Sequence, residues 1–479
     1  MRQLDPSLDA VGINWPELSA RRILSRLQVV LLALLVAAVI AAALLRPTAL
    51  LVTLLALSTA LYLATLFYRV VLLRVALRHP AEVRISDADA RAIPDGELPV
   101  YTILVPAYHE AEVIARTIAA LENLDYPADR LDIRLLLEED DRETIAAARL
   151  ATSALPREVV LVPSGLPRTK PKACNVGLLG ARGELVTIYD AEDRPEPLQL
   201  RRAVAAFRRL PPLVACLQAK LSYHNVHQNL LTRWFTAEYE TWFSLMLPAL
   251  ARVGGPVPLG GTSMHIPRAI LEAVGAWDPF NVTEDADLGV RLKRLGYEVA
   301  VLDSTTLEEA NSDVVNWVRQ RSRWYKGYLQ TWLVHMRQPI RLWREVGGRA
   351  FIGINLLLGA VPLVAVLNPV FWALTAIWFL AQPHALTVLL PAPIYYPALA
   401  SMLAGNFLAL YVSVIAIRVR RRPDLLLAVM LSPLYWGLMS IAAIRAVVQL
   451  VVAPSFWEKS MHGLDPTHTV DLVPDHAGR

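Results

Sequence analysis

Cysteine is nearly absent from this sequence, with Cys174 and Cys216 the only two in 479 residues. They lack metal-ligand spacing, which excludes a cysteine-based zinc module. Charged residues are also scarce at 19%, whereas hydrophobic residues reach 55%, too apolar for an ordinary soluble enzyme. The motifs GxxxxGK[ST], HExxH and GxSxG are all missing. Their absence excludes the phosphate-loop, zinc-protease and serine-hydrolase chemistries that they carry.

The apolar residues are concentrated at the two ends of the chain. Near the N-terminus, residues 29–45 and 50–67 form two runs, each close to the ~20 residues that cross a bilayer. A buried hairpin of a soluble protein is the alternative, but soluble helices rarely lack a polar face. We therefore predict a transmembrane hairpin within an N-terminal region, residues 1–83.

Basic residues around this hairpin predict its orientation, because Lys and Arg favour the cytosolic side of a membrane. The flanking residues are Arg21, Arg22 and Arg26 before the first run and Arg69, Arg74 and Arg78 after the second, whereas Arg46 stands alone between the runs. The N-terminus and the central domain, residues 84–339, are therefore expected in the cytosol. The net charge of +4 indicates topology and contact with lipid headgroups rather than nucleic acid.

The C-terminal region, residues 340–452, contains two further predicted spans, at 361–381 and 398–417. Residues 425–452 are apolar as well, but Pro433 interrupts them and Arg445 would face lipid at high cost. We predict an amphipathic segment at the cytosolic surface there, with a fifth span as the alternative. Residues 453–479 are then a cytosolic tail.

The central domain alternates short apolar runs with helical patterns. The expected strands are residues 100–105, 133–137, 159–162, 185–189 and 214–217, and the expected helices include 114–124 and 198–210. This alternation predicts a mostly parallel, Rossmann-like α/β sheet inserted between the membrane segments. Ligands of such sheets bind beyond the carboxyl ends of the strands.

Acidic residues follow two of these expected strands. Asp190, Glu192 and Asp193 come after one, and residues 138–141, Glu-Glu-Asp-Asp, come after another. Clustered carboxylates suit a hard cation such as Mg²⁺ or Mn²⁺, which would bridge a diphosphate. A solvated acidic turn is the alternative, although two clusters on one rim favour a functional site.

Two later motifs carry further candidates. Asp285 lies before a helical run, where it would accept a proton from an acceptor hydroxyl or merely cap the helix. Gln320, Arg323 and Trp324 share one helix face; Arg323 suits phosphate and Trp324 a sugar ring. The alternative is an amphipathic helix at the membrane surface.

In order and spacing, four motifs resemble those of the processive family 2 glycosyltransferases, the group with bacterial cellulose, chitin and hyaluronan synthases. They are Val-Pro-Ala-Tyr-His-Glu at 105–110, Asp-Ala-Glu at 190–192, Thr-Glu-Asp at 283–285 and Gln-Arg-Ser-Arg-Trp at 320–324. Asp190-x-Glu192 in place of Asp-x-Asp, and the acidic run at 138–141, resemble bacterial exopolysaccharide enzymes of the XagB and NfrB type. The resemblance implies a GT-A fold and the bacterial inner membrane.

The resemblance also implies roles for individual residues. Asp285 would be the base of an inverting transfer from a nucleotide sugar, usually a UDP-sugar, to a glycan or lipid acceptor. The donor residues would be Pro106, Tyr108, Glu110, Glu139, Asp140, Lys172, Asp190 and Glu192, with Asp190 and Glu192 (or Asp193) as metal ligands; Glu284, Gln320, Arg323 and Trp324 would serve the acceptor and pyrophosphate.

The tail carries one more implied element. Residues 456–463 lie where cellulose synthase has its gating loop, so Trp457, Lys459 and His462 would close over the donor, unless this is a disordered tail. Three hypotheses follow for the whole chain. It extends a polysaccharide and exports it, with any export partner unknown; it adds one sugar to a lipid; or it is an inactive assembly partner.

Overall fold

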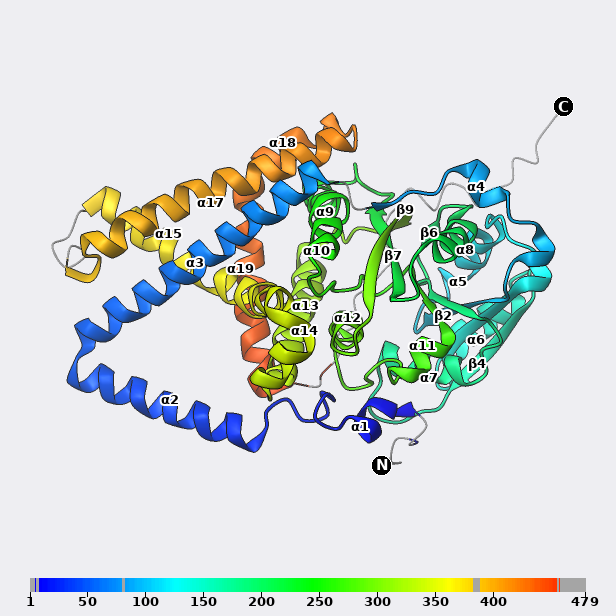
Figure 1. Ribbon diagram of the computed structural model, residues 1–479, viewed down its shortest axis with the longest axis horizontal. Coiled ribbons are helices and arrows are strands. Elements are labelled where there is room, and N and C mark those ends of the chain that lie inside the picture. Colours follow the sequence, from blue (N-terminus) through cyan, green and yellow to red (C-terminus); the bar gives the residue numbers. More distant parts are fainter. Residues whose placement is uncertain (1–4, 6–7, 80–81, 382–387, 455, 457–479) are drawn as a thin grey trace.

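The computed structural model describes residues 5, 8–79, 82–381, 388–454 and 456. Figure 1 shows the two parts of the molecule, a group of long helices at one end and a sheet with covering helices at the other. The expected α/β domain between helical segments is confirmed.

The sheet has a parallel core built from the strands that the sequence predicts. Its strand order is β1-β9-β7-β8-β5-β2-β3-β4. The four adjacent parallel strands are β2 (Tyr101–Ala107), β3 (Leu131–Glu138), β4 (Arg157–Val162) and β5 (Leu185–Ile188). Because all four run the same way, their carboxyl ends meet at one edge of the sheet.

Side chains of the central strands alternate between two hydrophobic cores. In β2, Ile103 and Val105 belong to one core and Leu104 to the other. Helices cover both faces, as a parallel sheet requires. The covering helices are α5 (Ile114–Glu122), α6 (Arg142–Leu150), α7 (Lys170–Leu179), α8 (Gln199–Arg209), α11 (Arg268–Ala273) and α12 (Glu284–Arg294).

The remaining strands extend the sheet beyond what the sequence predicts. Strand β8 (Met264–Pro267) lies antiparallel between β5 and β7 (Val214–Tyr223), and β9 (Glu298–Glu308) runs parallel to β7. The short strands β1 (Glu82–Val83) and β6 (Arg194–Pro195) both pair with β9. Strand β8 is only four residues long, too short for its periodicity to stand out from the surrounding loop.

Among the described residues, five helical segments have the length and composition to cross a membrane. They are α2 (Arg26–Leu45), α3 (Pro47–Arg78), the segment Pro339–Ala381, which is kinked at Gly347, α17 (Ala392–Val419) and α19 (Ser432–Val452). The segment Pro339–Ala381 comprises α14 (Pro339–Ile354), a π-turn (Asn355–Ala360) and α15 (Val361–Ala381). The four predicted spans lie within α2, α3, α15 and α17.

Pro433 behaves differently from the sequence expectation. Pro433 lies in the first turn of α19, where a missing N–H costs nothing, so it starts a helix instead of interrupting one. Helix α19 packs on α13 (Val314–His335) and α15, and Figure 1 shows it running across the direction of α17.

Candidate active site

The carboxyl ends of β2 and β3 and the turn after β5 open into one cavity of about 1140 Å³. Residues from all four sequence motifs line it. These residues are Pro106, Tyr108, Glu110, Asp190, Glu192, Glu284, Asp285, Gln320, Arg323 and Trp324. Segments more than 200 residues apart in the sequence therefore contribute to the same cavity.

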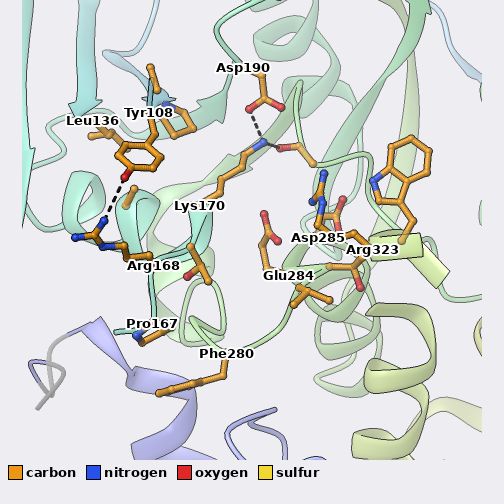
Figure 2. Close-up of a pocket in the computed structure, with 18 of the residues that line it drawn as sticks. Tyr108, Leu136, Pro167, Arg168, Lys170, Asp190, Phe280, Glu284, Asp285 and Arg323 are labelled. Atoms are coloured by element: carbon orange, nitrogen blue, oxygen red, sulfur yellow. Dashed lines mark hydrogen bonds and ion pairs between the residues drawn. The ribbon is translucent and has the colours of Figure 1, made fainter. Parts of the chain in front are cut away.

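Lys170, the first residue of α7, holds the acidic turn that follows β5. Its Nζ pairs with Asp190 and donates to the carbonyl oxygen of Gly261 at 2.9 Å, as Figure 2 shows. Burial alone would lower the pKa of Lys170, but the carboxylates of Asp190 and Glu284 raise it above its usual value. The amine therefore carries a full positive charge inside the cavity.

Lys172, the lysine chosen from the sequence, lies outside the cavity lining. Its Nζ donates to the backbone carbonyl oxygens of Pro163 at 2.5 Å and Gly165 at 3.1 Å. It therefore supports the loop before α7, and Lys170 lines the cavity where Lys172 was expected. The two lysines lie only two residues apart in the sequence, and their positions in the folded helix distinguish them.

Asp193, the alternative metal ligand, is used within the turn. Its buried carboxylate accepts from the backbone N–H of Asp190 at 2.7 Å and from the hydroxyl of Thr262. It is absent from the cavity lining, whereas Glu192 is present. The turn geometry therefore favours Asp190 and Glu192 as the pair that faces a ligand.

The acidic end of the cavity suits a divalent cation that is shared with a substrate. Within the described part of the chain, no three His, Cys, Asp or Glu side chains form a metal-binding group. Mg²⁺ is commonly held by one or two carboxylates together with substrate phosphates, which matches Asp190 and Glu192. Burial, and then the charges of Asp193, Asp190 and Glu192, raise the pKa of Glu308 at the end of β9. A cation here would relieve this repulsion.

Glu284 and Asp285 are the first two residues of α12. They lie across the cavity from Asp190, with Arg323 beside them (Figure 2). Burial raises the pKa of Asp285, whereas the N–H of Ala286, which donates to Oδ1 at 2.7 Å, and the cations Lys170 and Arg323 lower it. Burial and the charge of Asp285 raise the pKa of Glu284 to about 7.

Two glycines allow the close packing around Asp285. Gly261 has a φ of +83°, and a Cβ there would lie 3.0 Å from Asp285 Oδ2. Gly327 of α13 packs on Thr283, where a Cβ would come within 2.3 Å of the threonine side chain. Any larger residue would push the Asp285 loop away from the cavity wall.

Helix α13 carries the motif residues Gln320, Arg323 and Trp324. Gln320 Oε1 is buried without a hydrogen-bond partner in the described structure, which leaves it available to a ligand in the cavity. The Trp324 ring packs near Phe235 and Tyr239 of α9 (Leu230–Thr241), with centroid distances of 5.8 and 6.4 Å. The predicted shared face of this motif is present.

The end of the cavity near β2 and β3 differs in part from the expectation. Tyr108 lines it, and its hydroxyl accepts from Arg168 at 3.1 Å. Asp140 and Glu139 lie outside the lining; Asp140 pairs with Arg168 at 2.7 Å, and Glu139 accepts from the N–H of Ser164 at 2.8 Å. Glu138 lines the cavity instead. Glu139 and Asp140, which were expected to bind the nucleotide sugar, therefore hold the loop with Ser164 and Arg168 that covers this end of the cavity.

Several lining residues were not predicted from the sequence. Asp9, Ile13 and Arg21 come from the N-terminal segment, which the sequence assigned to a separate region. Phe456 lines the cavity from the other end of the chain, and its carbonyl oxygen accepts from Lys326 Nζ at 2.5 Å. The rest of the predicted gating loop, with Trp457, Lys459 and His462, lies outside the described residues.

Comparisons with known proteins find similarity over the central domain. Residues 99–327 match the model of the family described as Glycosyltransferase like family 2. The chain is 28% identical over 252 residues to the probable glycosyltransferase YdaM of Bacillus subtilis, covering 52% of this chain and 60% of YdaM. It is 29% identical over 306 residues to the beta-monoglucosyldiacylglycerol synthase of Synechocystis, covering 61% of this chain and 62% of the synthase.

A plant protein and a solved structure extend these matches. The probable glucomannan 4-beta-mannosyltransferase 14 of Arabidopsis thaliana is 26% identical over 275 residues, covering 54% of this chain and 51% of the plant protein. The chain thus spans about half to three fifths of these relatives. The mannosyltransferase PcManGT of Pyrobaculum calidifontis, solved with GDP-Man and Mn²⁺, superposes with a TM-score of 0.57 at 20% identity, covering 84% of this chain and 99% of PcManGT. The central domain of this chain therefore has the GT-A fold, and residues 99–327 of it match the family 2 glycosyltransferase model.

Proposed function

We propose that this protein transfers a hexose from a nucleoside diphosphate sugar to a hydroxyl group of a glycan at the membrane surface. The observation that carries the proposal is the convergence of Asp190, Lys170, Asp285 and Arg323 on one cavity. A base and a diphosphate-binding group on facing walls are what a direct displacement requires.

The proposed reaction is a single displacement. Asp285 accepts the proton of the acceptor hydroxyl as its oxygen bonds to the anomeric carbon, and the bond from that carbon to the diphosphate breaks. Lys170 and Arg323 lie where they neutralise the charge that grows on the leaving diphosphate. A divalent cation on Asp190 and Glu192 would add positive charge to the same group.

The acceptor end of the cavity supports a sugar acceptor. Trp324 and Tyr239 both line it, and aromatic rings offer apolar faces on which sugar rings stack. This favours a growing polysaccharide as the acceptor, with export across the same membrane as part of the proposal. The orientation proposed from the flanking arginines keeps donor and active site on the cytosolic side of a bacterial plasma membrane.

A lipid acceptor is the second candidate, favoured by the similarity to the Synechocystis synthase. The helices that surround the cavity include α13, which packs against the membrane-type helices α15 and α19. A lipid hydroxyl at the membrane surface would therefore reach the cavity over a short distance.

A donor screen tests both candidates. Detergent-purified protein is incubated with Mn²⁺ or Mg²⁺ and labelled UDP-glucose, UDP-N-acetylglucosamine or GDP-mannose, with and without added lipid, and Asp285→Asn serves as the inactive control. We expect one donor to give a product that is absent from the control. A long polymer supports the glycan acceptor and a single-sugar lipid supports the second candidate, whereas no turnover of any donor would contradict both.

A further inference from the structure

The N-terminal strap, defined here as residues 8–21, packs on the catalytic domain as tightly as a core element. Leu8, Val11, Leu18 and Ala20 are at most 6% exposed. The strap contains the short helix α1 (Ala10–Asn14), capped by Asp9, and continues into the membrane-type helix α2. A segment buried this well has a fixed position on the domain.

Hydrogen bonds attach the strap to the elements that carry the catalytic groups. Asn175 of α7 donates to the carbonyl oxygen of Leu8 at 2.9 Å, and α7 is the helix that begins with the cavity lysine. The N–H of Ala20 donates to Asp278 Oδ2 at 2.6 Å, in the loop that leads to the proposed base. The strap therefore connects two walls of the cavity.

A third attachment fixes the position of the strap relative to the membrane helices. Arg337, just after α13, donates to the carbonyl oxygens of Glu17 at 2.7 Å and Ser19 at 3.1 Å. Gln28 at the start of α2 donates to the carbonyl oxygen of Leu333 at 2.9 Å. The strap is thus held at both of its ends.

One face of the strap belongs to the cavity. Asp9, Ile13 and Arg21 line it, and the guanidinium carbon of Arg21 lies 5.6 Å from the ring centroid of Phe280, which also lines it. The Arg21 side chain is 70% exposed. It therefore lies at the mouth of the cavity, with most of its side chain exposed.

Arg21 has a weaker ion pair than the other cationic residues that line the cavity. Lys170 pairs with Asp190, and Arg168 pairs with Asp140 at 2.7 Å. The negative charges of Glu284, Asp285 and Asp190 all act on Arg323. Among the described contacts, the one ion pair of Arg21 is a long one, 3.9 Å to Asp9.

The Asp9 carboxylate is only a weak partner for Arg21. It already accepts the N–H of Gly12 at 3.0 Å as the cap of α1, and burial raises its pKa. We propose that Arg21 is a substrate-binding residue that receives a phosphate group at the mouth of the cavity. A guanidinium offers paired donors that match phosphate oxygens. The inference rests on the proposed function and extends it to the N-terminal strap.

Two sources share this phosphate chemistry, the diphosphate of the donor and a phosphate on the acceptor. Arg21→Ala is compared with Arg22→Ala, because Arg22 is also exposed and does not line the cavity. Binding of UDP and GDP with Mn²⁺ to the full-length protein is measured by calorimetry, and acceptor KM is measured in the transfer assay. Arg21→Lys keeps the positive charge and removes the paired N–H donors of the guanidinium.

We expect Arg21→Ala to weaken one of these two quantities about 10- to 100-fold, the range for a charged hydrogen bond. Arg22→Ala should stay within about twofold of the wild type, and Arg21→Lys should fall between the two. Weaker nucleotide binding identifies the donor as the source, whereas an increased acceptor KM alone identifies the acceptor.

The failure of this inference differs from the failure of the proposed function. A wild-type protein that turns over no donor contradicts the proposed function, while its nucleotide binding still compares the Arg21 and Arg22 variants. Equal nucleotide binding by the two variants, together with equal acceptor KM wherever turnover is measured, overturns the inference.

Discussion

The guanidinium of Arg321 forms a bidentate ion pair with Glu238, at 2.9 Å from Nη1 to Oε1 and 2.6 Å from Nη2 to Oε2. The same guanidinium carbon lies 4.5 Å from the ring centroid of Trp324. Tyr435 of α19 donates its hydroxyl to the same carboxylate at 2.7 Å. Arg321 therefore fixes a ring that lines the cavity and also connects α13 to α19.

Arg321→Lys should increase the acceptor KM about tenfold and leave nucleotide binding within about twofold of the wild type. A lysine keeps one charge beside Glu238 but loses the second hydrogen bond and the planar group that stacks on Trp324. Initial-rate kinetics and calorimetry measure the two quantities. Arg319→Ala on the exposed side of α13 is the control, and an unchanged acceptor KM in Arg321→Lys would exclude this positioning role.

This pair illustrates how far the sequence predicts the site. The motif at 320–324 identified Gln320, Arg323 and Trp324 because a helix places them on one face. Arg321 belongs to the same motif, but its guanidinium pairs with Glu238 of α9 beside the Trp324 ring, and that contact depends on how two helices pack. A local pattern predicts which residues share a face, and only the folded structure shows what each face meets.

The fold shows the same limit on a larger scale. The parallel strands were predictable because continuous apolar runs mark strands buried on both faces. Strand β8 and the N-terminal strap gain their positions from partners more than 45 residues away, such as β5 and Asn175. No sequence period carries that information, so both were missed. The sequence also did not show which of Lys170 and Lys172 lies in the cavity. The reason is related, since two residues at these positions of one helix point in different directions.

Those two lysines should respond differently to substitution. Lys170→Met removes the cation beside Asp190 and should reduce transfer at least 100-fold with weaker nucleotide binding. Lys172→Met leaves the carbonyl oxygens of Pro163 and Gly165 without a donor. It should destabilise the protein by about 1–3 kcal/mol and preserve most of the turnover. Thermal unfolding and transfer assays on both variants measure this contrast; the reverse pattern would support the predicted role of Lys172 in binding the nucleotide sugar.

Glu138 should make stability depend on pH. Burial raises its pKa to about 7, whereas an unfolded Glu titrates near about 4.3. The folded protein thus favours the neutral carboxyl, so this contribution to stability is complete below about pH 4.3 and is lost as pH rises to about 7. At about 1.4 kcal/mol per pKa unit its upper limit is roughly 4 kcal/mol.

Glu138→Gln should remove that dependence, because glutamine is neutral at every pH. Its unfolding midpoint should therefore exceed the wild-type value at pH 8 by more than it does at pH 5. The exposed Glu112→Gln is the matched control, and both are measured without nucleotide. Parallel pH curves for Glu138→Gln and the wild type would show that Glu138 is charged in the folded state.

Removal of divalent cations should stop transfer. EDTA treatment is expected to abolish activity, and Mn²⁺ or Mg²⁺ should restore it, because Asp190 and Glu192 line the cavity beside the proposed diphosphate site. Glu192→Gln should need more Mn²⁺ for half-maximal activity. Asp193→Asn should instead lower stability, since Asp193 bonds within the turn. Full activity after thorough chelation would contradict the metal site.

Asp285→Asn should abolish transfer and leave nucleotide binding nearly unchanged. An amide keeps the size of the side chain and its hydrogen bond from the N–H of Ala286, but it cannot accept the acceptor proton. The comparison variant is Glu284→Gln. Glu284 is the neighbour of Asp285, and its own carboxyl has a pKa of about 7, so it is half protonated near neutral pH. If Asp285 is the base, Glu284→Gln retains measurable turnover and changes the pH profile, whereas Asp285→Asn is inactive at every pH. Substantial turnover by Asp285→Asn together with an inactive Glu284→Gln would assign the proton transfer to Glu284, because both carboxylates face the same cavity.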